Sequence, residues 1–188
     1  MIKIGITGSI ASGKTTASKM ISFKKGPLFS ADDVVKKLYK QPKFQRKIAK
    51  ILRFKFKKNF KQEIKKQIFK NEFLLKKLEK IIHPLVRKYM NNFILKNKNK
   101  RILFFEIPLL IESKLKKNFD VVIFIKSGKK TRLRRYKRNG GDEKLFKLLS
   151  KYQLKDKKKM KYCDYIIVNN KSLNVLKKKL LHIIKIYG

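Results

Sequence analysis

The sequence is poor in several features that mark particular classes of protein. With one cysteine, Cys163, the chain cannot form an internal disulfide, which agrees with a reducing compartment. We expect Cys163 to act as a small buried hydrophobic residue beside a strand. No apolar run approaches the roughly 20 residues that span a bilayer, and the chain opens on MIKIGITG without a basic-then-apolar leader. We therefore expect a cytoplasmic protein with no membrane partner.

Acidic residues are also scarce, 12 against 53 basic ones, which gives a formal net charge of +41. Such a balance is typical of nucleic-acid-binding proteins. However, 45 of the basic residues are lysine and only 8 are arginine, the residue that makes bidentate contacts to bases and phosphates. The lysines are spread along the whole chain, and residues with G+C-rich codons are few. We attribute the charge to genome drift and expect no specific nucleic-acid partner.

Segments of strand and helix character alternate along the chain. Strands separated by helix-length segments predict βαβ units and a parallel sheet, hence an α/β fold. The expected strands are Lys3 to Thr7, Pro27 to Ser30, Arg101 to Phe105, Val121 to Ile125 and Tyr165 to Val168.

A helical insertion is expected between the second and third strands. From 41 to 98 apolar residues recur at helical spacing, and we interpret the His83-Pro84 step as the start of a helix, because proline is favoured at the first helical position. A second helical segment, 129 to 161, is basic and broken at Asn139 to Gly141. At 188 residues the chain fits one domain, with a core of 1–40 and 99–188 around this inserted lobe.

The strongest motif follows the first strand. The run GSIASGKT, Gly8 to Thr15, matches G-x-x-x-x-G-K-[ST] in full, between an expected strand and an expected helix. Glycines let the backbone wrap phosphates, and amides at a helix N-terminus attract the anion. We expect Lys14 to bridge the β- and γ-phosphates of ATP and the Thr15 hydroxyl to hold Mg²⁺. The predicted ATP-binding residues are Gly8, Ala11, Ser12, Gly13, Lys14, Thr15 and Thr16.

Two aspartates follow the second strand, at the sheet edge where ligands bind in open α/β folds. We expect Asp32 to be catalytic and Asp33 to cap or flank the next helix. Glu106 is the only carboxylate at the end of the third strand. The short chain favours a small kinase over other P-loop proteins.

With these motifs the chain resembles the dephospho-coenzyme A kinase family along its whole length. The similar segments are ADDVVKKL from Ala31, IF from Ile68, IHPLV from Ile82, PLLIE from Pro108 and CDYIIVNN from Cys163. The sequence departs from the family pattern at four positions, which are Ser30 for aspartate, Ala11 for a frequent glycine, Lys61 for arginine and Val168 for aspartate.

The resemblance implies a P-loop kinase fold with a five-stranded parallel sheet flanked by helices, an inserted helical acceptor-binding lobe and a lid at about 127–161. It implies transfer of the ATP γ-phosphoryl to the 3′-hydroxyl of dephospho-coenzyme A, with Asp32 as the catalytic aspartate. Lid arginines Arg134 and Arg138 would stabilise the transferring group, while His83 and Lys61 would contact the acceptor. Arg132 and Arg135 are weaker lid candidates, and His182 is expected to be structural.

The sequence alone leaves other functions open. The chain could be a kinase of a nucleoside or nucleotide, a nucleic-acid-binding NTPase, or a degenerate chain that binds nucleotide without turnover. No cysteine–histidine cluster has metal-ligand spacing, so Mg²⁺ carried by ATP is the one metal expected. We expect a monomer.

Overall fold

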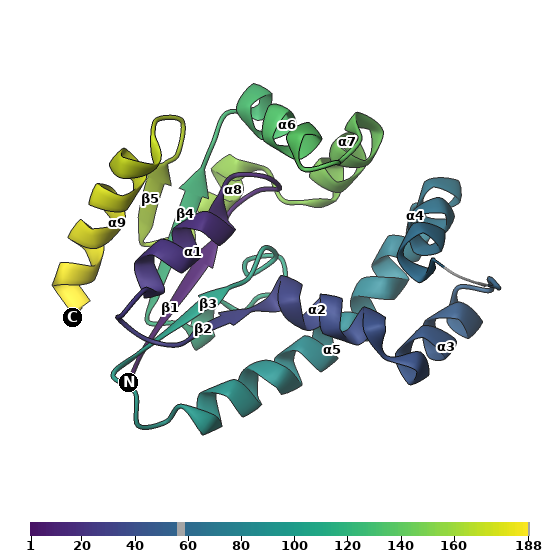
Figure 1. Ribbon diagram of the computed structural model, residues 1–188, viewed down its shortest axis with the longest axis horizontal. Coiled ribbons are helices and arrows are strands. Elements are labelled where there is room, and N and C mark those ends of the chain that lie inside the picture. Colours follow the sequence, from purple (N-terminus) through teal and green to yellow (C-terminus); the bar gives the residue numbers. More distant parts are fainter. Residues whose placement is uncertain (56–58, 188) are drawn as a thin grey trace. The chain divides into compact units, whose positions relative to one another are not determined.

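The computed structural model describes residues 1–55 and 59–187. Five parallel strands form one sheet in the order β2-β3-β1-β4-β5 (Figure 1). This confirms the predicted fold class. The strands are β1 (Ile2–Thr7), β2 (Leu28–Ser30), β3 (Ile102–Glu106), β4 (Val121–Lys126) and β5 (Tyr165–Val168).

Both faces of the central strands are covered, which explains why most residues of these strands are apolar. On one face, α1 (Lys14–Ser22) and α9 (Leu173–Tyr187) pack together over the sheet. On the other, the chain after β3 returns close to β1: a Cβ on Gly5 would lie 2.7 Å from Leu110 Cδ1. A side chain at this position would require Leu110 to shift. A 3₁₀ helix, η1 (Lys116–Asn118), follows before β4.

Contacts between Cα atoms divide the chain into two compact units, 1–30 with 94–188 and 31–93. We call these the core unit and the helical unit. The helical unit contains α2 (Ala31–Lys40), α3 (Pro42–Ile51), α4 (Phe60–Lys70) and most of α5 (Phe73–Lys96). In its interior the ring of Tyr39 packs against the rings of both Phe44 and Phe60. Burial raises the pKa of Tyr39 to about 12.

The expectation that a helix starts at His83-Pro84 is wrong, because Pro84 lies inside the continuous helix α5. A proline within a helix loses one backbone hydrogen bond, at a cost of about 3 kcal/mol. Buried side chains on both sides of this step, including Leu78, Ile82 and Met90, hold the helix together. Packing of the apolar face therefore outweighs the local preference.

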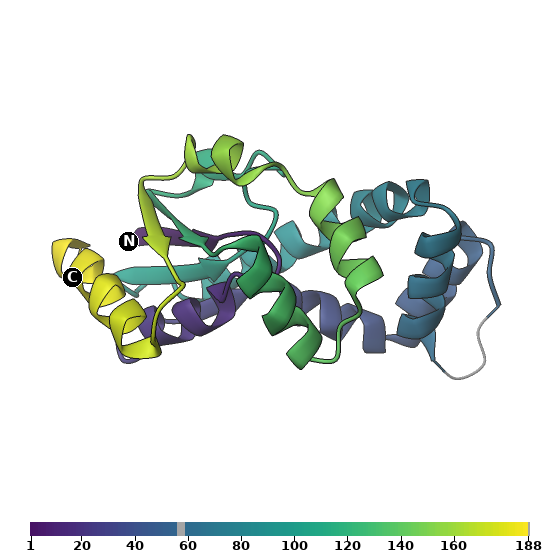
Figure 2. The same ribbon diagram turned by 90° about the horizontal axis from the view of Figure 1, so that it is seen from above.

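The basic segment folds into three helices of the core unit, α6 (Lys129–Arg138), α7 (Glu143–Tyr152) and α8 (Asp156–Met160) (Figure 2). The break expected at Asn139 to Gly141 lies between α6 and α7, where the Asp142 side chain caps α7 by accepting from the Leu145 amide at 2.7 Å. After α8, Cys163 is half-buried and its thiol donates to the Lys159 carbonyl oxygen at 3.3 Å. Burial, followed by the charge of Asp164, raises the pKa of Cys163 to about 11.

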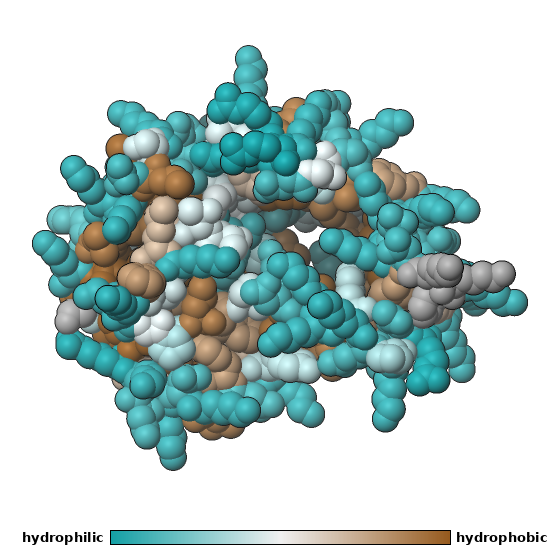
Figure 3. Space-filling model, viewed as in Figure 1, coloured by the Kyte–Doolittle hydropathy of each residue, from teal (hydrophilic) through white to brown (hydrophobic). Residues whose placement is uncertain are grey.

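Hydrophilic side chains occur over the whole face seen in Figure 3, with apolar areas between them, and are not gathered on one element. This matches the dispersal of lysine along the sequence. Among the described residues, no helix has the length and apolarity required to cross a membrane.

Candidate active site

The P-loop, residues 8–15, leads from the end of β1 into α1. Its glycines are required by the backbone: φ is +154° at Gly8 and +92° at Gly13. A Cβ on Gly8 would lie 2.6 Å from the Ile125 carbonyl oxygen, and one on Gly13 would overlap the Asn169 side chain. Ala11 also has a positive φ, +57°, although it is not glycine. The loop is therefore a tightly wound turn with little space for side chains.

Three of the predicted ATP-binding residues form the first turn of α1. Lys14 is buried, Thr16 is half-buried, and Thr15 is exposed, and this turn holds no acidic residue. The amides at a helix N-terminus and a nearby ammonium group both favour an anion. The start of α1 therefore has the charge and the helix N-terminus that favour binding of a phosphate group.

Glu106 faces this turn from the neighbouring strand. It is the last residue of β3, which pairs with β1, and it is 1% exposed. The Thr15 hydroxyl donates a hydrogen bond to Glu106 Oε1 at 2.5 Å. A hydroxyl and a carboxylate side by side are hard oxygen ligands of the kind that Mg²⁺ takes together with phosphates and water. The residues present therefore fit the metal that accompanies ATP. The sequence places Glu106 at the end of a strand but does not by itself indicate this role.

Arginines of α6 contact the loop from outside. Arg135 donates to the Ser12 carbonyl oxygen at 3.3 Å, and Arg132 to that of Ile10 at 3.5 Å. Arg134 and Arg138, the lid arginines expected to be catalytic, are exposed. Burial lowers the pKa of Arg135, and the positive charges of Arg134 and Arg138 lower it further. These three like charges repel one another, and an anion bound beside them would relieve the repulsion.

Asn169 is a loop contact that sequence reasoning missed. It follows β5, is 3% exposed, and donates from Nδ2 to the Ser12 carbonyl oxygen at 2.9 Å. The backbone carbonyl oxygen of Asn169 accepts from Arg135 at 3.1 Å. The signal in the sequence was its position directly after an apolar strand. Strand ends of a parallel sheet meet at one edge, so Asn169 lies beside the P-loop although it is far away in sequence.

Asp32 and Asp33 lie in the first turn of α2, directly after β2. Both side chains are exposed. Asp33 forms an ion pair with Lys36 at 2.8 Å, as suits a residue that flanks the helix. Asp32 shows no such pairing with Lys36 and remains the predicted catalytic aspartate.

The predicted acceptor contacts, Lys61 and His83, belong to the helical unit. Lys61 is exposed in the first turn of α4, and His83 is half-buried in α5. Burial lowers the pKa of His83, and the charge of Arg87 lowers it further. Both effects favour the neutral form of His83, which can hydrogen-bond to an acceptor.

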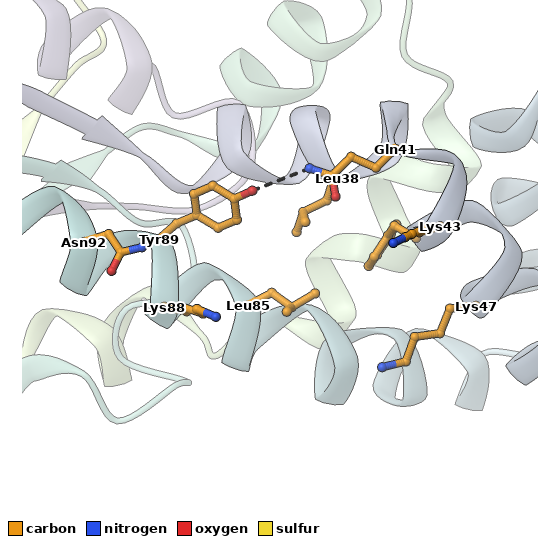
Figure 4. Close-up of a pocket in the computed structure, with 9 residues that line it drawn as sticks. Leu38, Gln41, Lys43, Lys47, Leu85, Lys88, Tyr89 and Asn92 are labelled. Atoms are coloured by element: carbon orange, nitrogen blue, oxygen red, sulfur yellow. Dashed lines mark hydrogen bonds between the residues drawn. The ribbon is translucent and has the colours of Figure 1, made fainter.

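A cavity of about 460 Å³ in the helical unit lies among α2, α3 and α5 (Figure 4). Lys43, Lys47 and Lys88 line it, and the Gln41 amide donates to the Tyr89 hydroxyl at 3.5 Å across one side. Neither predicted acceptor contact lines this cavity. Two positions along a helix correspond to a rotation of about 200°, so His83 and the cavity residue Leu85 lie on different faces of α5.

Comparisons with known proteins agree with one another. A family model described as dephospho-CoA kinase matches residues 2–174. The dephospho-CoA kinase of Rickettsia prowazekii is 34% identical over 186 residues, covering 98% of this chain and 97% of that protein. The solved dephospho-CoA kinase from Campylobacter jejuni aligns with a TM-score of 0.64 at 26% identity, over 99% of this chain and 97% of its own. A Thermus thermophilus structure, with a TM-score of 0.80 at 23% identity over 100% and 98% of the two chains, has the same fold.

Proposed function

The chain belongs to the dephospho-CoA kinase family, and we propose that it transfers the γ-phosphoryl group of ATP to the ribose 3′-hydroxyl of dephospho-CoA, giving CoA and ADP. The observation that carries the phosphoryl-transfer part of the proposal is the hydrogen bond between Thr15 and Glu106, next to the P-loop lysine in sequence, while the acceptor is supported by the family match. A loop of this kind, a lysine at the helix start and a hydroxyl–carboxylate pair are the parts that P-loop enzymes use for phosphoryl transfer.

The proposed ATP contacts follow from the chemistry of the loop. Backbone amides from Ala11 to Thr16 would surround the β- and γ-phosphates, and the Lys14 ammonium would follow the γ-phosphoryl group as charge develops on it. The Thr15 hydroxyl and the Glu106 carboxylate would hold Mg²⁺. When bound with ATP, this ion neutralises charge on the phosphate oxygens.

The proposed lid is the segment from about 127 to 161, with Arg134 and Arg138 as the groups that approach the equatorial phosphoryl oxygens. Their support is electrostatic: both are exposed cations on α6, the helix whose Arg132 and Arg135 contact the P-loop carbonyls. An anion in the loop would attract them, and their approach would exclude water that could otherwise accept the phosphoryl group.

For the acceptor, we assign Asp32 to the 3′-hydroxyl. An ionised carboxylate can accept the hydroxyl hydrogen bond, orient its oxygen and take the proton as the phosphoryl group arrives. His83 and Lys61 would contact other parts of dephospho-CoA within the helical lobe. All of these groups come from one chain, so a monomer suffices for the reaction, and the single half-buried thiol suits the reducing cytoplasm.

The experiment that tests this function offers Mg²⁺ and ATP with a panel of acceptors, which are dephospho-CoA, nucleosides and nucleoside monophosphates. ADP and CoA should form in equal amounts with dephospho-CoA. Turnover with a nucleoside monophosphate and none with dephospho-CoA would assign the chain to a different kinase.

The high positive charge of the chain suggests one alternative function, that of a nucleic-acid-dependent NTPase. Dispersed lysines predict weak, salt-sensitive binding of DNA or RNA without stimulation of ATP turnover. A several-fold stimulation by either nucleic acid at physiological salt would favour this alternative.

A further inference from the structure

The P-loop is held from outside by polar contacts that phosphoryl transfer does not use. The Ile10 amide donates to Gln153 Oε1 at 2.9 Å, and the Ser9 hydroxyl donates to the Asp156 carboxylate. Gln153 follows α7, and Asp156 begins α8. Two consecutive loop residues are thus tied to the single turn that joins these helices.

This turn is itself anchored by a buried ion pair. Lys159 is 0% exposed, and its ammonium group lies 2.6 Å from Glu112 Oε1, which also accepts from the Leu154 amide at 3.1 Å. The Lys159 ammonium also donates to the Pro108 carbonyl oxygen at 3.3 Å, an atom that accepts from the Thr7 hydroxyl at 3.1 Å. Buried charges require such partners, so these contacts hold this end of the proposed lid segment beside the end of β1, and the approach proposed above would be made by α6 with its arginines.

The residue next to these contacts has an unfavourable backbone. Ala11 has φ at +57°, in the left-handed region that glycine adopts readily and alanine does not. A residue keeps such an unfavourable conformation only where contacts of the surrounding structure hold it there. Both backbone groups of Ile10, the preceding residue, are bonded: its amide to Gln153 and its carbonyl oxygen to Arg132.

We propose that Gln153 is a positioning residue for ATP binding. By holding the Ile10 amide, it keeps Ala11 in the left-handed conformation in which the following loop amides face a phosphate group. Asp156 assists by holding Ser9, and the Lys159–Glu112 pair fixes the turn that carries both acceptors. The inference rests on the proposed function only in that the chain binds ATP, and it does not depend on the acceptor.

A simpler role for Gln153 is to end α7 and stabilise the fold. The two roles differ in one respect. If Gln153 holds Ala11 in place, then a residue at position 11 that adopts positive φ without strain removes the need for it. If Gln153 only stabilises the fold, the residue at position 11 does not matter.

The first measurement is the dissociation constant of Mg²⁺-ATP by calorimetry, without any acceptor. Gln153→Met keeps the size of the side chain but removes the hydrogen-bond acceptor, and we expect about fivefold weaker binding, as for the loss of one hydrogen bond. Lys155→Met is the matched control, because Lys155 is an exposed residue of the same turn. Its variant should bind ATP as the unchanged protein does. Equal affinity of the Gln153→Met variant and the unchanged protein would contradict the proposal.

The second measurement is a double-mutant cycle with Ala11→Gly. The effect of Gln153→Met is measured separately in the alanine and the glycine backgrounds, and it should fall from about fivefold to less than about twofold with glycine. An equal effect in both backgrounds would leave Gln153 with a structural role only. Thermal unfolding checks that each variant folds, and Gln153→Asn, which is too short to reach Ile10, replaces Gln153→Met if that variant does not fold. Failure of the acceptor experiment above would leave these binding results intact.

Discussion

Thr15 and Glu106, 91 positions apart in sequence, are joined by a 2.5 Å hydrogen bond at the carboxyl-terminal end of the central strands. Thr15 comes from the first turn of α1 and Glu106 from the end of β3, and the parallel pairing of β1 with β3 brings them together. This pair is the part of the proposed metal site that a substitution can test most directly.

Glu106→Gln should lower turnover by about 10²-fold, within the range found when one preorganised electrostatic group is removed. The amide keeps the shape and can still accept from Thr15, but it loses the negative charge that attracts Mg²⁺. The Mg²⁺ concentration needed for half-maximal turnover should therefore rise. A titration of turnover with Mg²⁺ at saturating ATP measures both effects.

The control is Glu143→Gln. Glu143 lies at the start of α7, where it pairs on the surface with Lys137 and Lys147. This variant should respond to Mg²⁺ as the unchanged protein does. An unaltered Mg²⁺ requirement in Glu106→Gln would remove Glu106 from the metal site.

Lys14→Ala should lower turnover by at least about 10²- to 10³-fold, the effect of about 3 to 4 kcal/mol of lost transition-state stabilisation. The ammonium group should matter more while the phosphoryl group is being transferred than while ATP is merely bound, so kcat should fall more than the ATP affinity. Lys19→Ala, which removes an exposed lysine of the same helix, serves as the control. Near-normal kcat for Lys14→Ala would mean that this loop is not the site of transfer.

Asp32→Asn should lower turnover by about 10²-fold or more, because the amide loses both the charge and the proton acceptor. ATP affinity should change little. Asp33→Asn should cost only about 1 kcal/mol of stability, since it removes a flanking charge at the start of α2. Steady-state kinetics and thermal unfolding of the two variants separate these effects. The reverse pattern would move the catalytic assignment to Asp33.

His83→Ala should raise the KM for dephospho-CoA about fivefold, the cost of one lost hydrogen bond, without changing the KM for ATP. Lys88→Gln is the matched change on the cavity side of α5 and should leave both values unaltered. A rise in the acceptor KM for Lys88→Gln alone would place dephospho-CoA in the cavity.

Strands and loop were predictable because their signals are local. The β1 segment is mostly apolar, with Ile2, Ile4 and Ile6, and the P-loop motif fixes its residue types by position. Pro84 was misinterpreted because the apolar face that carries α5 through the proline depends on packing against distant residues. Packing also decides which arginines of α6 contact the P-loop. Arg132 and Arg135 do so, but the sequence of α6 alone does not distinguish them from Arg134 and Arg138.

The contacts of Gln153 and Asn169 could not be predicted for a similar reason. Each is a neutral side chain. Asn169 lies in the CDYIIVNN segment directly after an apolar strand, which places it at the ligand-binding end of the sheet but does not say what it contacts, and no motif singles out Gln153. Their partners are backbone atoms of Ile10 and Ser12, more than a hundred positions away along the chain. Only the folding of the sheet brings these groups together.

The state of the one thiol has a practical consequence for spectroscopy. Thiol reagents attack the thiolate, and a pKa of about 11 leaves Cys163 almost entirely protonated at neutral pH. The unmodified protein should therefore react slowly with maleimides. A cysteine introduced at an exposed position of α6, such as Lys137→Cys, should be labelled selectively without removing Cys163. A fluorophore there would report directly on movement of the basic segment when ATP is added.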